Sequence, residues 1–389
     1  MYERMMPRPM AVRELQDMKI AVIIPKYGSV GGAEGFAFEL VERLAVRRGI
    51  EVHLFAHRCH PGPAPVTYHR VPVLPFPRFM RQISFAWWVN RFVQARHFDV
   101  IHSHDRIFHM HLYSMHGIPH QTWIREVRGK RRSLFDRSMA WVEKKGISGP
   151  PWPRVLPVST LVKHELLRQY DIPESQIEVI HPGVALERFS NVDRAACRRE
   201  VRTRHGLQDA DVVMLFVGMN FEIKRLGLTV KAMAHAVDQG DQGRRLKLLV
   251  VGRGEERIYQ REARRLGMGD RLIFAGVRET VEPYYLASDF FVMPSVFDTF
   301  GMAVLEAMAA GLPVIITRKV GARDLVEDGE TGFILPDPPS VEGLGEKMVC
   351  LSHAENRSKM GGRARKIARQ HDWVSVADRM EEVYRGMGP

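Results

Sequence analysis

The chain of 389 residues has few cysteines and no long hydrophobic run. Its three cysteines, Cys59, Cys197 and Cys350, are far apart, which excludes the close spacing of a cysteine metal site or a redox motif. A reducing cytoplasm is the expected compartment. No apolar run approaches the length of a membrane-spanning helix, and residues 1–18 are charged and lack the apolar core of a signal peptide. We therefore expect residues 1–18 to be an extension.

Acidic residues are the minority charge. The sequence has 57 Lys and Arg against 45 Asp and Glu, a formal net charge of +12, which implies an anionic partner. Nucleic acid, an acidic membrane surface and phosphorylated substrates all remain open on charge alone. The length, with 45% hydrophobic and 26% charged residues, suffices for two α/β domains with substantial cores.

Short apolar runs alternate with helical patterns along the whole chain. The runs that predict buried strands are residues 19–25, 51–57, 66–73, 99–104, 212–218, 289–294 and 313–317. Residues 246–256 and 271–279 each predict a further strand-to-helix turn. Helices are predicted at about 33–47, 78–97 and 301–310, and residues 340–387 read as helical throughout. Strands that alternate with helices predict parallel sheets. The polar segment 191–211 separates the two halves, and we expect the hinge there.

Residues 295–311, SVFDTFGMAVLEAMAAG, follow one predicted strand and precede another. Asp298 lies in the loop before the predicted helix, and Glu306 lies about one and a half turns inside it. A loop carboxylate can reach sugar hydroxyls, a helix carboxylate can bind a ribose diol, and the helix-start amides can face a diphosphate. The stretch therefore predicts a nucleotide-sugar site at the carboxyl edge of a parallel sheet.

The segment DTFGMAVLEAMAAGLPV resembles the acid, seven residues, glutamate signature of retaining glycosyltransferases of family 4. The first acid of that signature is usually Glu, whereas here it is Asp298, one methylene shorter. The resemblance covers about residues 19–387 and implies the GT-B fold, in which two Rossmann-like α/β domains face a cleft. The implied units are an N-terminal acceptor domain (19–200), a C-terminal nucleotide-sugar domain (201–371) and a last helix (372–389) that crosses back to the N-terminal domain.

Family members commonly have an Arg directly after the strand at 212–218 and a Lys five residues further on, and both bind the donor diphosphate. Here these positions hold Met219 and Lys224. A cation is needed because the leaving nucleoside diphosphate gains charge as the glycosidic bond breaks. We expect Lys224 to be the main electrophilic residue and Arg225 to replace the missing Arg. A solvated basic pair at a helix start is the alternative.

Six histidines lie between residues 102 and 120 without the ligand spacing of a zinc site. The resemblance implies instead that His116 faces the transferred sugar, and that His104 with Asp105 matches a strand end of the family. His102 is expected to be an ordinary buried sheet histidine. Glu34 could touch an acceptor hydroxyl, although a plain first-turn acid at a helix start is the alternative.

Together these inferences give a full set of candidate residues. The expected catalytic residues are His116, Lys224 and Asp298, and the expected acceptor-binding residues are Glu34, His104 and Asp105. The expected donor-binding residues are Gly31, Gly32, Arg225, Gly252, Val277, Arg278, Phe300, Gly301, Met302 and Glu306. Paired glycines before a helix let a backbone approach a ligand closely, although such a pair is often only a turn.

Residues 154–190, with an IHPGV segment and an Arg-Phe pair, are similar to the lipopolysaccharide core glucosyltransferase branch of family 4. The resemblance implies transfer of a hexose, with glucose from UDP-glucose expected, to a lipid-linked saccharide without a metal or other cofactor. The basic, aromatic segments 78–97 and 122–145 suit an anionic membrane surface, and a buried helix is the alternative for the first. We expect a peripheral protein at the inner face of the cytoplasmic membrane.

Three other functions remain as alternatives. One is a mannosyl- or N-acetylglucosaminyltransferase with another donor or a soluble acceptor, and a second is a nucleotide-sugar epimerase on the same fold. The third is a basic nucleic-acid-binding protein on a degenerate transferase fold. Because the sequence has no motif that reads RNA or DNA, we expect no nucleic-acid partner.

Overall fold

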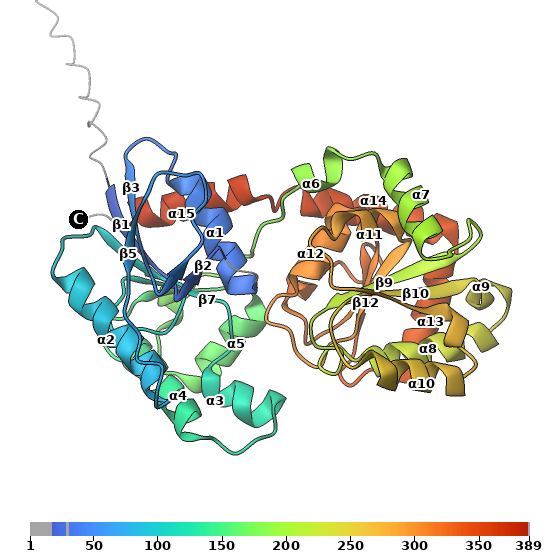
Figure 1. Cartoon of the computed structure of the whole chain (residues 1–389), viewed down its shortest axis with the longest axis horizontal. Helices are drawn as coiled ribbons and strands as arrows, with labels where there is room; N and C mark the ends of the chain where they lie inside the picture. The colour runs from blue at the N-terminus through green and yellow to red at the C-terminus, as the bar shows by residue number, and fades with distance from the viewer. Residues whose placement is uncertain (1–17, 29–30, 388–389) are drawn as a thin grey trace, which may run out of the picture.

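The computed structural model describes residues 18–28 and 31–387, which form two α/β domains side by side (Figure 1). Each domain is built around one six-stranded sheet. The expected extension at residues 1–18 lies, apart from Met18, outside the described residues. Within the described part of the chain, no helix has both the length and the apolar character needed to cross a membrane.

The N-terminal sheet has the strand order β5-β3-β1-β6-β7-β8. Its strands are β1 (Met18–Ile23), β3 (Ile50–Ala56), β5 (Val66–Arg70), β6 (Val100–Ser103), β7 (Leu112–Met115) and β8 (Arg154–Pro157). Ile20 of the central strand β1 lies opposite Val52 of β3 and Val100 of β6, in parallel register. Helices cover both faces, so β1 is a continuous apolar run and does not alternate.

The helices of this half, with one minor strand pair, lie around that sheet, except α6, whose Phe189 packs against Tyr285 of the C-terminal domain. They are α1 (Gly32–Leu44), α2 (Met80–Gln94), α3 (His120–Thr122), the π-helical turn η1 (Trp123–Val127), α4 (Leu134–Ile147), α5 (Thr160–Gln169), η2 (Glu174–Gln176) and α6 (Glu187–Ser190). The minor pair is β2 (Lys26–Tyr27) with β4 (Arg58–Cys59).

The C-terminal sheet has the order β11-β10-β9-β12-β13-β14, and its pairings are also parallel. Its strands are β9 (Val212–Gly218), β10 (Leu246–Gly252), β11 (Leu272–Gly276), β12 (Phe290–Met293), β13 (Val314–Thr317) and β14 (Gly332–Leu335). The helices and turns are α7 (Arg194–Arg204), α8 (Leu226–Asp238), α9 (Asp241–Arg244), α10 (Glu256–Arg265), η3 (Gly269–Arg271), α11 (Glu282–Ala287), α12 (Met302–Ala309), η4 (Gly321–Leu325), α13 (Val341–Ser352), α14 (Ala354–Ala368) and α15 (Trp373–Arg385).

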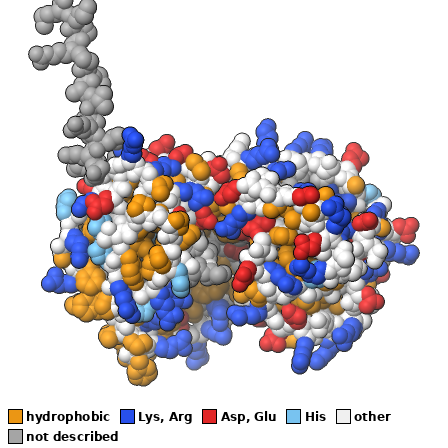
Figure 2. Space-filling view, turned by 45° about the horizontal axis from the view of Figure 1, so that its top comes forward, with side chains coloured by type: hydrophobic (Ala, Val, Ile, Leu, Met, Phe, Trp, Pro, Cys, Tyr) orange, Lys and Arg blue, Asp and Glu red, His pale blue; other side chains and the backbone are white. Residues whose placement is uncertain are grey.

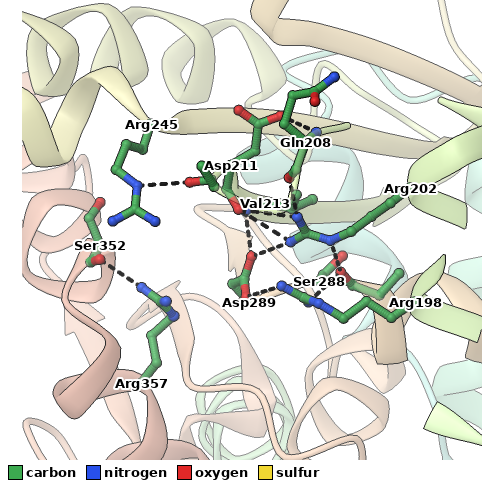
Figure 3. Close-up of polar contacts among 12 residues, drawn as sticks. Arg198, Arg202, Gln208, Asp211, Val213, Arg245, Ser288, Asp289, Ser352 and Arg357 are labelled. Carbon is green, nitrogen blue, oxygen red and sulfur yellow. Dashed lines mark hydrogen bonds and ion pairs between the residues drawn. The ribbon is translucent and has the colours of Figure 1, made fainter. Parts of the chain in front are cut away.

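Helix α7 is fastened to the C-terminal domain by its arginines. In Figure 3 the guanidinium groups of Arg198 and Arg202 both point to Asp289, at 3.1 Å and 2.9 Å. Asp289 also accepts a hydrogen bond of 2.8 Å from the amide of Val213 at the start of β9. Because Arg202 is only 3% exposed, this pairing offsets much of the cost of burying its charge. Helix α7 is therefore part of the C-terminal domain.

The segment expected to separate the two halves, residues 191–211, thus contains a docked helix. The expected domain boundary between residues 200 and 201 falls inside α7. An arginine-rich helix looks like a solvated connector in the sequence because its partner, Asp289, is distant along the chain.

The C-terminal segment consists of three successive helices, α13, α14 and α15, where the sequence read as one helical stretch. As expected, the last of them crosses back to the N-terminal domain, and Figure 1 shows α15 lying along α1. The Tyr384 hydroxyl lies 2.7 Å from Nδ1 of buried His102. Arg47, which follows α1, binds Asp378 at 2.6 Å and Glu381 at 2.5 Å. The final helix therefore packs on the N-terminal domain.

Candidate active site

A cavity of about 570 Å³ lies between the two domains and is lined by both. The predicted site residues that line it are Gly31, Gly32, His116, Lys224, Asp298, Phe300, Gly301, Met302 and Glu306. A hollow separates the two domains in the space-filling view (Figure 2). The carboxyl ends of parallel strands open on this cavity, which is where open α/β sheets place ligands.

Helix α12 presents its first turn to the cavity. Gly301, directly before it, has φ of +89°, and a Cβ there would lie 2.8 Å from Met293 Cε and 3.0 Å from Val320 Cγ1. Only glycine fits this left-handed and crowded position without strain. The first amides of α12 have no carbonyl partner within the helix, so this end can bind an anion.

Glu306 reaches the cavity from the second turn of α12. Its Oε2 accepts a hydrogen bond of 2.7 Å from the hydroxyl of Tyr285, which is completely buried. Burial raises the pKa of Glu306 above its ordinary value, and the hydrogen bond from Tyr285 opposes that rise. The negative charge of nearby Glu282 adds to the rise. The hydrogen bond from Tyr285 therefore fixes the position of the Glu306 carboxylate, and the protonation of that carboxylate depends on Tyr285 and Glu282.

Lys224 and Asp298 bind each other through Nζ and Oδ2. The two side chains are 18% and 17% exposed, so the pair is partly shielded from water at the cavity wall. The loop that carries Asp298 is fixed by backbone hydrogen bonds of 2.9 Å on both sides, from Asp298 N to Lys319 O and from Gly321 N to Asp298 O. The cation and the carboxylate expected at a sugar diphosphate are therefore brought together.

Arg225 lies outside the lining of this cavity, so its expected role in place of the missing arginine stays a prediction. Its guanidinium donates to Asp337 at 2.6 Å and to the carbonyl of Pro294 at 3.3 Å. These bonds turn the side chain toward a separate hollow on the C-terminal domain. The backbone of Arg225 has φ of +57°, a left-handed conformation directly before α8.

Three charged residues that line the cavity are not among those predicted from the sequence, namely Glu39 of α1, Arg188 of α6 and Glu282 of α11. Arg188 is 60% exposed and lies 3.5 Å from Glu282 and 3.6 Å from Glu39. The sequence feature that could have pointed to Arg188 is the Arg-Phe pair noted in the family resemblance. The place of Arg188 at the cavity depends on how the two domains meet, so no local sequence pattern predicts it.

His116 and His104 form a stacked pair at the ends of β7 and β6. His104 Nδ1 lies 2.9 Å from His116 Nε2, and the rings are parallel within 10°. Burial lowers the pKa of His116 to about 3 and that of His104 well below its ordinary value, so both are neutral at neutral pH. His116 lines the cavity, whereas His104 lies behind it.

His102 is the ordinary buried histidine that the sequence suggested. It is 0% exposed, and its ring nitrogens lie 2.7 Å from the Tyr384 hydroxyl and 2.8 Å from the Ser114 hydroxyl. Burial lowers its pKa to about 3. Within residues 18–28 and 31–387, no group of three or more His, Cys, Asp or Glu side chains is arranged to hold a metal ion.

The other expected acceptor residues lie outside the cavity lining. Glu34 is in the first turn of α1, and its carboxylate covers Gly31. Asp105 accepts a hydrogen bond of 2.6 Å from the amide of Arg106, and burial raises its pKa. The negative charge of Glu34 adds to this rise. Their acceptor role, like that of His104, stays a prediction.

Gly252, Val277 and Arg278 also lie outside the cavity lining. A Cβ at Gly252 would clash with the carbonyl of Gly218, so this glycine permits close strand packing. Val277 is 58% exposed, and the Arg278 guanidinium lies 5.8 Å from the Tyr284 ring centroid. The structure therefore does not unite these three residues with the rest of the predicted donor site.

Direct bonds across the domain interface fix the cavity walls. The Ser159 hydroxyl donates to the Thr299 carbonyl at 2.6 Å, and the Thr160 amide donates to Asp324 Oδ2, also at 2.6 Å. His181 Nε2 lies 3.1 Å from the same oxygen. Burial alone would raise the pKa of Asp324, but the hydrogen bonds from His181 and Thr160 lower it below its ordinary value. A charged Asp324 thus links the start of α5 to the C-terminal domain.

Two family models match the chain. Residues 30–188 match a model described as Glycosyltransferase Family 4, and residues 211–353 match one described as Glycosyl transferases group 1. A curated relative, D-inositol 3-phosphate glycosyltransferase from Streptomyces scabiei (strain 87.22), is 27% identical over 92% of this chain and 87% of its own length.

Solved structures share the fold across both domains. WaaG, a glycosyltransferase involved in lipopolysaccharide biosynthesis, has a TM-score of 0.79 at 20% identity and covers 94% of this chain and 100% of its own. HepE of Anabaena in complex with UDP-glucose has a TM-score of 0.70 at 19% identity, over 95% of this chain and 100% of its own. The expected GT-B fold is confirmed. The chain therefore carries a glycosyltransferase family 4 domain followed by a glycosyl transferases group 1 domain, and it is a glycosyltransferase of the GT-B fold.

Proposed function

We propose that this glycosyltransferase moves a hexose from a nucleotide sugar, with retention of anomeric configuration, to a lipopolysaccharide core or a related lipid-linked saccharide. The observation that carries the proposal is the meeting of Lys224, Asp298, Glu306 and His116 at one interdomain cavity. Charged groups from one domain and a neutral imidazole from the other suit a ligand with an anionic nucleotide end and an uncharged sugar end.

Each group has a role that follows from its position. Glu306 would hold the ribose diol, and the first amides of α12 together with Lys224 would bind the diphosphate. Asp298 and His116 would contact the hexose. UDP-glucose is the proposed donor, and the complex of HepE with UDP-glucose on the same fold supports this choice.

In the proposed reaction, the bond between hexose C1 and the diphosphate oxygen breaks while the acceptor hydroxyl forms a bond to C1 on the same face. The acceptor proton passes to the departing phosphate oxygen. Lys224 and the helix amides stabilise the charge that develops on the nucleoside diphosphate, so the proposal includes no metal. Because His116 is uncharged, it can hydrogen-bond a hexose hydroxyl without competing for the diphosphate. Closure of the cleft would exclude water that otherwise hydrolyses the donor.

Two acceptor classes have support from the comparisons. WaaG acts in lipopolysaccharide biosynthesis, whereas the Streptomyces relative is named for D-inositol 3-phosphate. We favour the lipid-linked acceptor because Phe76 and Trp87, near and on α2, are 83% and 53% exposed. Figure 2 shows hydrophobic side chains gathered on the N-terminal domain, together with Lys and Arg. Such a surface suits a peripheral location at the anionic inner face of the cytoplasmic membrane.

The test is transfer of labelled sugar from UDP-glucose, UDP-N-acetylglucosamine, GDP-mannose and ADP-glucose to truncated lipopolysaccharide cores and to inositol 3-phosphate. We expect transfer from UDP-glucose to a core, with an α-linked product by NMR. Lys224→Gln should lower kcat about 100-fold or more, because it removes a cation from the developing charge. Lys231→Gln, at a position 52% exposed on α8, is the matched control and should have no effect. No transfer from any donor, or a β-linked product, would contradict the proposal.

A further inference from the structure

A second cavity, of about 640 Å³, lies in the N-terminal domain and shares no lining residue with the interdomain cavity. We call it the basic cavity, because six of its lining side chains are cationic. It is lined by Gln121, Arg125, Lys130, Arg131, Arg132, Arg137, Ala140, Trp141 and Lys144.

Four adjoining pieces of chain build the basic cavity. Gln121 belongs to α3, Arg125 to η1, and residues 130–132 to the turn before α4. Helix α4 contributes Arg137, Trp141 and Lys144, which lie four and then three residues apart and so share one face of the helix. The Arg132 guanidinium donates to the Gln121 amide oxygen at 3.1 Å, which ties the turn to α3.

The acids of the same segment turn away from the basic cavity. Glu126 binds Arg168 at 2.7 Å, and Asp136 lies 3.0 Å from His120. Glu143 is completely buried and binds Arg106 at 2.5 Å. Across the part of the chain that the structure describes, no carboxylate forms an ion pair with any of the six cations. Opposite charges that are mixed in the sequence are therefore separated in space.

Six like charges around one cavity repel each other, and a multiply charged anion would relieve that repulsion. Arginine binds phosphate through two parallel N–H groups, so a cavity with four arginines favours phosphate over a single carboxylate. Trp141 adds an apolar face. Its side chain is 47% exposed, and its ring packs edge-on against Phe108 with centroids 5.3 Å apart, which limits its movement. A flat aromatic face beside phosphate-binding groups suits a sugar ring that carries phosphates.

The basic cavity is close to the proposed catalytic cleft along the chain. His116 lines the interdomain cavity, and Gln121, five residues later, lines the basic cavity. Five residues extend no further than about 18 Å, so one oligosaccharide can reach both places. We propose that the basic cavity binds the phosphate-bearing part of a phosphorylated saccharide acceptor. This inference rests on the proposed function, since it names the chemistry of that acceptor.

The experiment compares two double variants of the full chain by isothermal titration at constant ionic strength. Arg131→Gln/Arg132→Gln removes two charges from the basic cavity, and Arg58→Gln/Arg70→Gln removes two from the exposed strands β4 and β5 of the same domain. The probe is glucose 1,6-bisphosphate, with glucose as the uncharged comparison. We expect the cavity variant to bind the bisphosphate about thirtyfold more weakly than the wild type. The control variant should bind the bisphosphate as tightly as the wild type does. Glucose should bind neither variant.

Two further measurements separate the possible outcomes. UDP binding tests the proposed function independently, and it should be equal in the wild type and both variants. Loss of UDP binding by all of them would reject the proposed function, whereas intact UDP binding with equal bisphosphate affinities would overturn only the basic-cavity proposal.

Vesicles of phosphatidylglycerol and phosphatidylcholine test for a lipid headgroup. If the cavity variant lost vesicle binding and kept bisphosphate binding, the site would recognise lipid and the proposal would be overturned.

Discussion

At the residue scale, Glu306 depends on one buried hydroxyl. Burial and Glu282 raise its pKa, and the hydrogen bond from Tyr285 opposes that rise because it favours the ionised carboxylate. Tyr285→Phe removes only this hydroxyl, so the pKa of Glu306 should rise further. If the charged carboxylate binds ribose, the UDP affinity of this variant should be about tenfold lower than that of the wild type at neutral pH. On acidification, the variant should begin to lose UDP affinity at a higher pH than the wild type. Titration calorimetry across pH measures both effects.

The neighbouring tyrosine is the matched control. The Tyr284 hydroxyl is buried and has no hydrogen-bond partner among the described residues, so Tyr284→Phe removes the same atom from an equally buried ring. It should leave UDP affinity and its pH profile unchanged. A similar loss of affinity in both variants would mean that the phenol hydroxyls matter for packing alone, and the proposed link from Tyr285 to Glu306 would be wrong.

At the scale of the element, the entry into α12 depends on glycine at one point. Gly301→Ala adds a Cβ that meets both Met293 and Val320 at a positive φ, so the first turn of α12 must move. We expect a loss of about 1–3 kcal/mol in the free energy of unfolding and at least a tenfold rise in the donor KM. Urea denaturation and initial-rate kinetics measure the two effects.

Gly329→Ala provides the comparison, because Gly329 also has a positive φ, +78°, but a Cβ there meets no atom within 4 Å. This variant should lose about 1 kcal/mol of stability through backbone strain alone and keep the donor KM of the wild type. Equal KM values for the two variants would show that the start of α12 does not bind the donor.

At the scale of the whole molecule, the buried histidines connect stability to pH. The pKa of His102 is about 3 in the folded chain and about 6.5 in a model peptide, so the folded state binds fewer protons. The stability from its uncharged burial is fully present above pH 6.5 and is lost as pH falls toward 3. Each pH unit between these values is worth about 1.4 kcal/mol, so His102 alone should cost about 2 kcal/mol at pH 5.

Urea unfolding at pH 7.5, 6.5 and 5 measures this loss. His102→Gln keeps polar atoms near Tyr384 and Ser114 but does not titrate, so its stability should decline less between pH 6.5 and pH 5. His97→Gln, at a side chain 93% exposed, should retain the full decline of the wild type. Parallel pH curves for His102→Gln and the wild type would refute the assignment.

Local sequence determined the elements and part of the site. Apolar runs such as residues 212–218 specified their strands because a sheet buried on both faces requires uninterrupted apolar side chains. Asp298 and Glu306 were found because a loop and the helix that follows it fix their spacing without reference to any distant part of the chain. His116 and Lys224 were found by resemblance, and both line the cavity.

Which charged groups meet depends on how distant segments of the chain pack together. Arg225 lies next to Lys224 in the sequence, yet it binds Asp337, while Arg188 reaches the cavity from α6 and pairs with Glu282. The same holds for α7, whose arginines find Asp289, and for the basic cavity, whose acids are bound elsewhere. The periodicity of apolar residues in the sequence predicts which side chains are buried, because apolar side chains are driven out of water in any fold. It carries no information on ion pairs between distant segments, since those depend on how the two domains and the last helix pack together.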